Sequence, residues 1–169
     1  MDIKYEKILE EAQENWINKQ IEIDRKKEYE DNIIDILEDE IYEGEYKEGM
    51  KNGNGYFKWF DGSAFEGTFR MNNIEGKGKY IWSDNRQYNG EWKNNQMNGF
   101  GVFTWPDGRK YEGMFVDNKK HGLGEYVYAD GRKYKGMWSA GLQNGKGVFY
   151  NPKTKEWKEG IWENGKKVE

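Results

Sequence analysis

Few residues of this chain could carry out chemistry. His121 is the single histidine and there is no cysteine. A nucleophile–histidine–acid triad or a cluster of nitrogen and sulfur metal ligands therefore cannot be assembled. Carboxylate pairs such as Glu43 and Glu45 have the spacing of an exposed strand, without the pocket that acid–base catalysis needs. We therefore expect no catalytic residue, no metal site, no cofactor and no enzymatic activity.

Five Gly-x-Gly pairs, of which Gly99 and Gly101 form one, suggest a phosphate-binding loop at first sight. Such a loop needs a glycine turn between a strand and a helix, so that the helix N-terminus faces the phosphate. Here each pair opens another segment with the alternation of a strand, and no Gly-Lys-Ser/Thr follows. The pairs do not indicate a nucleotide site.

Aromatic and basic residues occur together, as they do in nucleic-acid-binding proteins. The chain is acidic overall, with a net charge of −4, and its basic clusters are short: Lys119-Lys120, Arg132-Lys133-Lys135 and Lys166-Lys167. A surface that follows a phosphate backbone needs a continuous basic stripe, so no nucleic-acid partner is expected. Residues 1–41 carry a net −8, which leaves +4 for the rest of the chain.

The strongest pattern is a glycine period of 23 residues. One of its series is Gly44, Gly67, Gly90, Gly113 and Gly136. A period of this length indicates an array of stacked units. Arrays of this kind usually present a long binding surface.

Within each unit the residues alternate with the period of a strand. In the third unit Tyr88, Gly90 and Trp92 alternate with polar residues, whereas the stretches 94–98 and 106–108 are turn-like. Asparagine, glycine and proline favour turns there. Each unit is predicted to be a β-hairpin, and ten or eleven strands in all are expected to form one sheet.

The shared pattern, YxGxW…GxGxxxxxDG, resembles the MORN (membrane occupation and recognition nexus) repeat in five consecutive units from Tyr42 to Glu156. The resemblance implies a mostly β fold: an open single-layer antiparallel sheet of tandem 23-residue hairpins. The units are 42–64, 65–87, 88–110, 111–133 and 134–157, with a partial unit 158–165 and a tail 166–169. The separate catalytic domains of some family members have no counterpart here.

Some units depart from the pattern. The second has Phe65 for the leading tyrosine and Asn85 for the glycine of the Asp-Gly turn. The sixth has Lys158 at the aromatic position, with Trp157 one residue early. Terminal repeats of arrays are often atypical, so we expect irregular hairpins near the C-terminal end. The exposed edge there, near Ile161 and Trp162, is a candidate for homodimer formation.

Residues 1–41 contain neither glycine nor proline. Apolar residues at helical spacing from Tyr5 to Trp16 predict an acidic amphipathic helix, and the isoleucines from Ile33 to Ile41 suggest a second helical stretch. Three interpretations remain open. This segment covers the sheet, binds a partner or a second copy, or stays disordered.

The predicted sheet places aromatic side chains on one face at nearly every second position. One interpretation is that these rings are simply the core of the array. Because a surface of this size exceeds what a monomer normally exposes, the other is that they form a groove filled by the N-terminal helix, a partner or a second copy. The anchors we choose are Tyr88, Trp92, Trp105, Tyr111, Tyr134 and Trp138. The opposite face becomes apolar in the C-terminal half and offers a second surface at Phe100, Met114, Leu123 and Met137.

These observations predict a non-catalytic scaffold that docks an extended or helical segment of a partner protein in the aromatic groove. The alternative is a peripheral membrane tether that binds anionic phospholipid headgroups through Lys119, Lys120, Arg132 and Lys133. The N-terminus has no signal-peptide pattern, so a cytoplasmic protein is expected. The family resemblance adds a cytoskeletal, ciliary or cortical membrane setting.

Overall fold

The computed structural model describes residues 40–169. The helices predicted for residues 1–41 thus fall almost entirely outside the described residues. Ile41 was assigned to the second helical stretch, and that assignment is wrong. It begins the first strand, where it pairs with Lys58.

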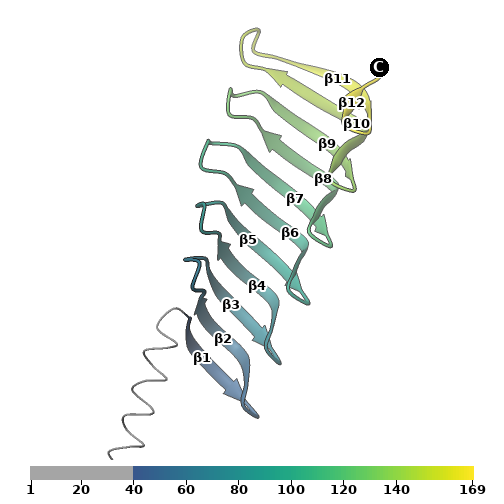
Figure 1. Cartoon of the computed structure of the whole chain (residues 1–169). Helices are drawn as coiled ribbons and strands as arrows, with labels where there is room; N and C mark the ends of the chain where they lie inside the picture. The colour runs from purple at the N-terminus through teal and green to yellow at the C-terminus, as the bar shows by residue number, and fades with distance from the viewer. Residues whose placement is uncertain (1–39) are drawn as a thin grey trace, which may run out of the picture. The chain divides into compact units, whose positions relative to one another are not determined.

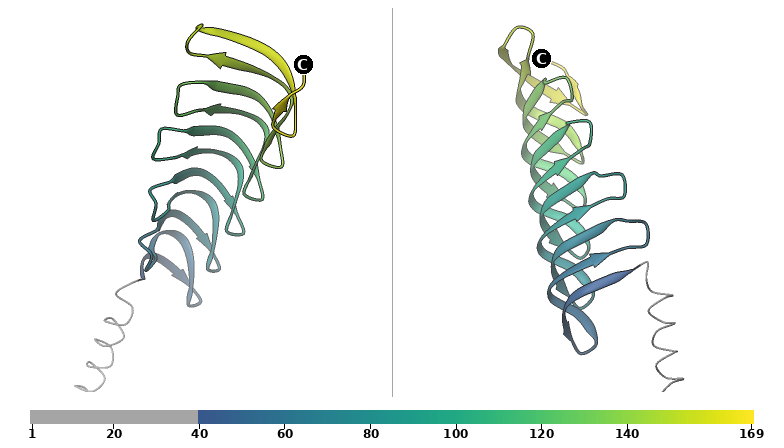
Figure 2. Two further views of the ribbon diagram at one scale, coloured as in Figure 1. Left: turned by 45° about the horizontal axis from the view of Figure 1, so that its top comes forward. Right: turned by 90° about the vertical axis from the view of Figure 1, so that its left-hand side faces the viewer.

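The described residues form one antiparallel sheet of 12 strands in which every strand pairs with its neighbours in the sequence (Figure 1). The left view of Figure 2 shows that the strands all bend in the same direction. The strands are β1 Ile41–Lys47, β2 Met50–Lys58, β3 Ala64–Arg70, β4 Asn73–Ile81, β5 Gln87–Lys93, β6 Gln96–Thr104, β7 Lys110–Val116, β8 Lys119–Val127, β9 Lys133–Ser139, β10 Leu142–Asn151, β11 Glu156–Glu163 and β12 Lys166–Lys167.

Each hairpin closes with a two-residue turn, which is tighter than the sequence predicted. In the third unit the turn is Asn94-Asn95, with φ of 49° and 64°, and β6 already begins at Gln96. The turn predicted for residues 94–98 is therefore confined to residues 94 and 95. Two positive φ values are typical of a type I′ turn, whose twist matches that of the two strands.

Turn asparagines also tie one hairpin to the next. The backbone N–H of Asn95 donates to the carbonyl of Ile74 at 3.0 Å, and its side-chain oxygen accepts from the N–H of Ile74 at 2.7 Å. Asn118 and Met97 repeat this pair of bonds one unit later. In the turn of the fifth unit the equivalent residue is Gly141, which has no side chain and makes only the backbone bond: its N–H donates to the carbonyl of Lys120.

Five-residue connections join the first five hairpins to one another, and a four-residue connection, 152–155, leads from β10 to β11. In one of them the N–H of Trp105 donates to the carbonyl of Arg109, and the N–H of Gly108 donates to the carbonyl of Trp105. Gly108 has a positive φ of 89°. In the second unit Asn85 takes this conformation with φ 65°, so the departure from Asp-Gly leaves the turn intact, because asparagine tolerates a positive φ.

A glycine spine crosses the sheet where the strands meet. Gly90 pairs with Gly101, and Gly101 pairs with Gly113 on its other side. The ring of Tyr88 fills the space beside Gly90 and Gly101 that Cβ atoms would otherwise take. The aromatic rings can therefore lie flat on the backbone, and the core is a single layer made of rings and Ile74.

The C-terminal end departs from the other units, as the sequence predicted: the connection 152–155 has four residues and β12 has only two. β11 pairs with β10 from Gly145 to Asn151 without a shift of register. The region 166–169 is not a free tail, because β12 pairs with Trp162 and Glu163. The N–H of Ile161 donates to the carbonyl of Glu169, and the N–H of Val168 donates to the carbonyl of Ile161. The edge proposed for a homodimer is therefore covered by the chain's own end.

Candidate functional site

The six predicted aromatic anchors lie in the ring layer, which we call the aromatic face. Five of them are buried, three of these completely: Tyr88, Tyr111, Tyr134, Trp92 and Trp138. Trp105 is partly exposed. Most of the chosen anchors are thus parts of the core, and a partner on this face would meet Trp105 but little of the other five.

Packing between neighbouring units explains this burial. The ring of Tyr88 packs edge-to-face against Trp92 of its own unit and Phe115 of the next, with centroids 5.0 and 5.1 Å apart. Tyr111 repeats the arrangement with Phe115 and Trp138 at 5.0 and 5.2 Å. Each such pair contributes about 0.5–1.5 kcal/mol beyond its buried area.

The polar atoms of these rings are satisfied within the sheet. The hydroxyl of Tyr88 donates to the carbonyl of Glu91 at 2.9 Å, and Tyr111 donates to Met114 at 3.0 Å. The indole N–H of Trp92 donates to the carbonyl of Gly78. Burial strongly raises the pKa of Tyr88 and of Tyr111, because the phenolate would lose its hydration. These hydroxyls therefore stay protonated and serve the fold.

A different set of rings is partly exposed on the aromatic face. It recurs every 23 residues just after the second strand of each of the first four hairpins, and we call it the exposed row: Trp59, Trp82, Trp105 and Tyr128. Trp105 packs on Phe103 with centroids 4.4 Å apart, and Trp82 reaches the same Phe103 at 5.1 Å. The buried layer thus holds the row in place and leaves part of each ring open.

An arginine lies over each of three rings of the exposed row. The guanidinium of Arg109 is 5.1 Å from the centroid of Trp105 and is paired with Asp107 at 2.7 Å. Arg86 and Arg132 repeat this on Trp82 and Tyr128. Hydrogen bonds from Arg109 lower the pKa of the Asp107 carboxyl. From the sequence, Arg132 was predicted only as a lipid contact and Arg86 and Arg109 were not singled out, although Asp-x-Arg recurs in the sequence with the same period.

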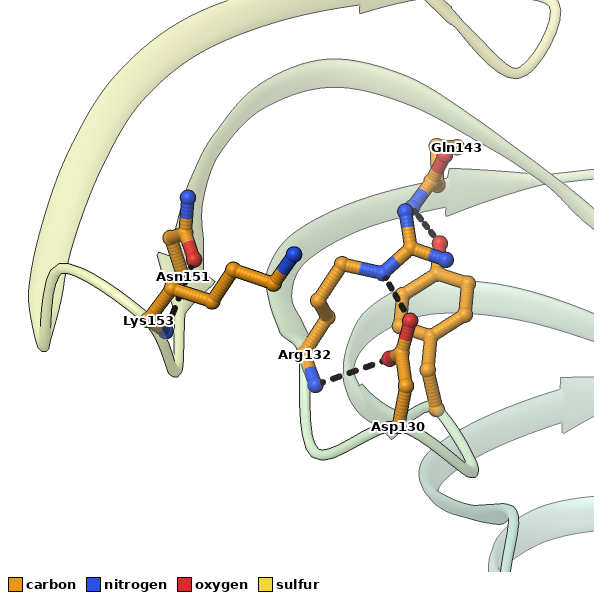
Figure 3. A network of polar contacts seen from close by, with 6 residues as sticks. Asp130, Arg132, Gln143, Asn151 and Lys153 are labelled. Atoms are coloured by element: carbon orange, nitrogen blue, oxygen red, sulfur yellow. Dashed lines mark hydrogen bonds and ion pairs between the residues drawn. The ribbon is translucent and has the colours of Figure 1, made fainter.

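Figure 3 shows this arrangement in the fourth unit. The backbone N–H of Arg132 donates to Asp130, and its side chain makes a second bond to the same carboxylate at 2.7 Å. Gln143 donates to the hydroxyl of Tyr128 at 3.1 Å. Asp130 and Arg132 also line a hollow of about 500 Å³ together with Asn151, Pro152 and Lys153.

Lys120 places a charge within the aromatic face. Its ammonium lies 4.4 Å from the ring centroid of Trp138, 4.5 Å from Tyr126, 5.4 Å from Tyr111 and 6.0 Å from Trp105. We call these four rings the Lys120 cage. Burial, and secondly the charge of Arg109, lower the pKa of Lys120 to about 8.

The four cations predicted to bind lipid do not form one surface. Lys120 lies in its cage, and Arg132 is paired with Asp130 over Tyr128. Lys119 pairs with Val116 beside one hairpin turn, whereas Lys133 pairs with Val127 at the other end of β8. The structure therefore does not bring the predicted headgroup contacts together.

The second predicted surface does come together on the opposite face. Phe100 pairs with Met114 and Leu123 pairs with Met137, so that the four side chains lie on the neighbouring strands β6 to β9. All four are exposed, with Leu123 the most exposed at 68%. Leu123 also lines a hollow of about 730 Å³ with Val148 and Ile161.

The described residues contain no group of three or more acidic, histidine or cysteine side chains that could hold a metal ion. His121 is exposed and pairs across the sheet with Met114. Over residues 40–169 there is no helix that is long and apolar enough to span a bilayer.

No curated protein matches the chain. Among solved structures, the SAS-4 (dCPAP) TCP domain in complex with a proline-rich motif of Ana2 (dSTIL) of Drosophila melanogaster is 18% identical, with a TM-score of 0.29. That match covers 66% of this chain and 73% of that chain. We draw nothing about function from a similarity of this size.

The family model of the MORN repeat matches five tandem stretches, 42–64, 65–85, 88–108, 111–131 and 134–153. Each match begins at the ring that opens a unit and ends in or next to the turn that follows its second strand. Together the matches cover more than half of the chain. The chain therefore belongs to the MORN-repeat family, whose repeat is a non-enzymatic type.

Proposed function

We propose that the chain is a non-catalytic scaffold that binds a segment of a partner protein on its aromatic face. The observation that carries this proposal is the exposed row, in which Trp59, Trp82, Trp105 and Tyr128 keep part of their rings open. Partly exposed tryptophan, tyrosine and arginine side chains are the types that dominate binding energy at protein interfaces. The row supplies tryptophan and tyrosine, and arginines lie over three of its rings.

The spacing of the row favours an extended segment. Successive rings are two strands apart, which corresponds to roughly 9.6 Å. A polyproline II segment rises about 3.1 Å per residue and turns once every three residues, so every third side chain points the same way at intervals of about 9.3 Å. Such a segment, lying across the strands, could place one apolar side chain beside each of Trp82, Trp105 and Tyr128.

The proposal is tested with a phage-displayed random peptide library selected on the full chain. The selected peptides are expected to bind the wild type and to change its tryptophan fluorescence. The variant Trp82→Ala/Trp105→Ala should bind them at least about tenfold more weakly, as expected for the loss of central contacts. The control Trp157→Ala removes an exposed ring that stacks on Tyr150 outside the exposed row, and it should bind normally.

A second measurement uses the wild type alone, so its result does not depend on whether the double variant folds. Hydroxyl-radical oxidation of Trp82 and Trp105 in the wild type should fall when a selected peptide is bound, whereas oxidation of Trp157 should not. Peptides that bind without protecting the row would contradict the proposal.

The lipid-tether alternative is tested with the same preparation. The alternative predicts that vesicles of phosphatidylserine and phosphatidylcholine sediment the wild type. They should then fail to sediment a variant with glutamate at four positions: Lys119, Lys120, Arg132 and Lys133. The cytoskeletal, ciliary or cortical setting rests on the family resemblance alone, and imaging of a tagged copy in native cells tests it.

A further inference from the structure

Lys120 stands at a position where the neighbouring units use uncharged side chains. The equivalent residues of the second, third and fifth units are Ile74, Met97 and Gln143, and only the first unit also has a lysine, Lys51. Ile74 is buried and Met97 is partly buried against the ring layer. An apolar side chain therefore suffices for packing at this position, and the charge of Lys120 is not needed for the fold.

The surroundings of Lys120 leave its charge uncompensated. Among residues 40–169 no carboxylate lies within ion-pair distance of its ammonium, and the nearby Arg109 already holds Asp107. The cations Lys120 and Arg109 and the carboxylate of Asp107 together carry a net charge of +1. The four rings attract the ammonium through their faces, but no hydrogen bond joins its N–H groups to another side chain or carbonyl of residues 40–169.

We propose that Lys120 is a carboxylate-binding point, which takes the side chain of an aspartate or glutamate in the bound partner segment. This inference rests on the proposed function and adds the chemistry of the partner to it. The ammonium lies 6.0 Å from the ring centroid of Trp105, so an apolar side chain beside Trp105 and an acidic one a residue or two away could be bound together. A single leftover charge matches one carboxylate.

The local environment makes such a contact selective. Arg109 disfavours the charged form of Lys120, and an incoming carboxylate would offset that repulsion as well as the loss of hydration. An ion-paired hydrogen bond in a partly dry site is stronger than one in water. An amide of the same shape would bring no charge and would gain much less. The segment should therefore discriminate aspartate or glutamate from asparagine or glutamine.

The test starts from the peptides selected on the full chain. We expect an acidic residue at a fixed distance from the apolar residue that protects Trp105. The tightest peptide and its amide version, with that residue changed to asparagine or glutamine, are measured against wild type, Lys120→Met and Lys51→Met by fluorescence titration. Lys120→Met copies Met97 of the preceding unit, and Lys51→Met removes the equivalent lysine from the first unit.

The expected result is a loss of about tenfold or more for the acidic peptide on Lys120→Met, the size of a charged hydrogen bond. The amide peptide should bind Lys120→Met and the wild type equally, and Lys51→Met should bind both peptides as the wild type does. Equal binding of the acidic peptide to wild type and Lys120→Met would overturn the inference but leave the scaffold proposal standing. Failure of every peptide to bind the aromatic face would overturn both.

Discussion

The ring of Tyr88 occupies the space that a Cβ atom of Gly101 would need. Tyr88 lies on β5 and Gly101 on β6, and the two strands meet at the pair Gly90 and Gly101. The same relationship recurs one unit later between Tyr111 and Gly124. The glycine period of the sequence is thus a packing requirement, because each ring can lie flat only where the paired strand has no side chain.

Replacement of Gly101 by alanine is expected to lower the free energy of unfolding by about 3–4 kcal/mol. The added methyl group must displace Tyr88, which overpacks the ring layer and breaks the bond from the hydroxyl to Glu91. Urea denaturation followed by tryptophan fluorescence measures the change. The control is Gly76→Ala, where φ is 74° but the nearest atom is Thr68 Cβ at 3.5 Å. It should cost only about 1 kcal/mol, and equal costs for the two variants would contradict this account of packing.

Phe65→Tyr is expected to stabilise the sheet by about 0.5–1 kcal/mol. The first residue of each of the five full units is aromatic, and Phe65 is the one without a hydroxyl. In the other four units this residue is a tyrosine whose hydroxyl donates to the carbonyl three residues later. A tyrosine at position 65 could donate to the carbonyl of Thr68 in the same way. The reciprocal change, Tyr88→Phe, should cost a similar amount. Thermal unfolding of both variants checks the pair, and shifts in the same direction would refute the prediction.

Gly141→Asn is expected to raise the free energy of unfolding by about 0.5–1.5 kcal/mol. Gly141 has a φ of 89° and makes only the backbone bond to Lys120, and an asparagine there could also accept from the N–H of Lys120. The substitution also reduces the freedom of the unfolded chain. Asn95→Gly removes the equivalent bond to Ile74 and should destabilise by a similar amount. Urea midpoints that do not move in opposite directions would show that the turn asparagines contribute nothing.

Lys120→Met is expected to be more stable than the wild type near pH 7, by about 1–2 kcal/mol. The folded protein lowers the pKa of Lys120 to about 8, from about 10.4 in an unfolded chain. Below pH 8 the lysine is charged in both states, and its desolvation cost is present in full, offset in part by attraction to the rings. Between about pH 8 and 10.4 the unfolded chain binds the proton more tightly, so wild-type stability rises relative to the variant.

Urea denaturation of wild type and Lys120→Met at pH 7 and at pH 9.5 tests this expectation. The advantage of the variant should shrink at the higher pH. Lys119→Met is the matched control, because it removes an exposed lysine next in sequence while the Lys120 cage stays unchanged. An advantage that is the same at both pH values would show that charge burial at Lys120 is not its cause.

The repeat fold could be predicted from the sequence because each of its requirements is local. Alternation of residues such as Tyr88, Gly90 and Trp92 defines a strand and its two faces, and the 23-residue period carries the prediction from one hairpin to the next. The apolar patch on the opposite face followed in the same way, since Phe100 and Met114 have fixed places in the repeat.

The exposure of each ring was decided by the tertiary structure. Tyr88 is buried because Phe115 of the next unit packs against it, whereas Trp105 lies near the strand end and stays partly open. The two share a face, so alternation alone cannot separate them. The place of Lys120 likewise depends on the neighbouring units, because rings from β7, β8 and β9 and Trp105, which follows β6, converge on it. The sequence by itself determined the period, the strands and their faces. Contacts between units determined which rings and charges are left for a partner.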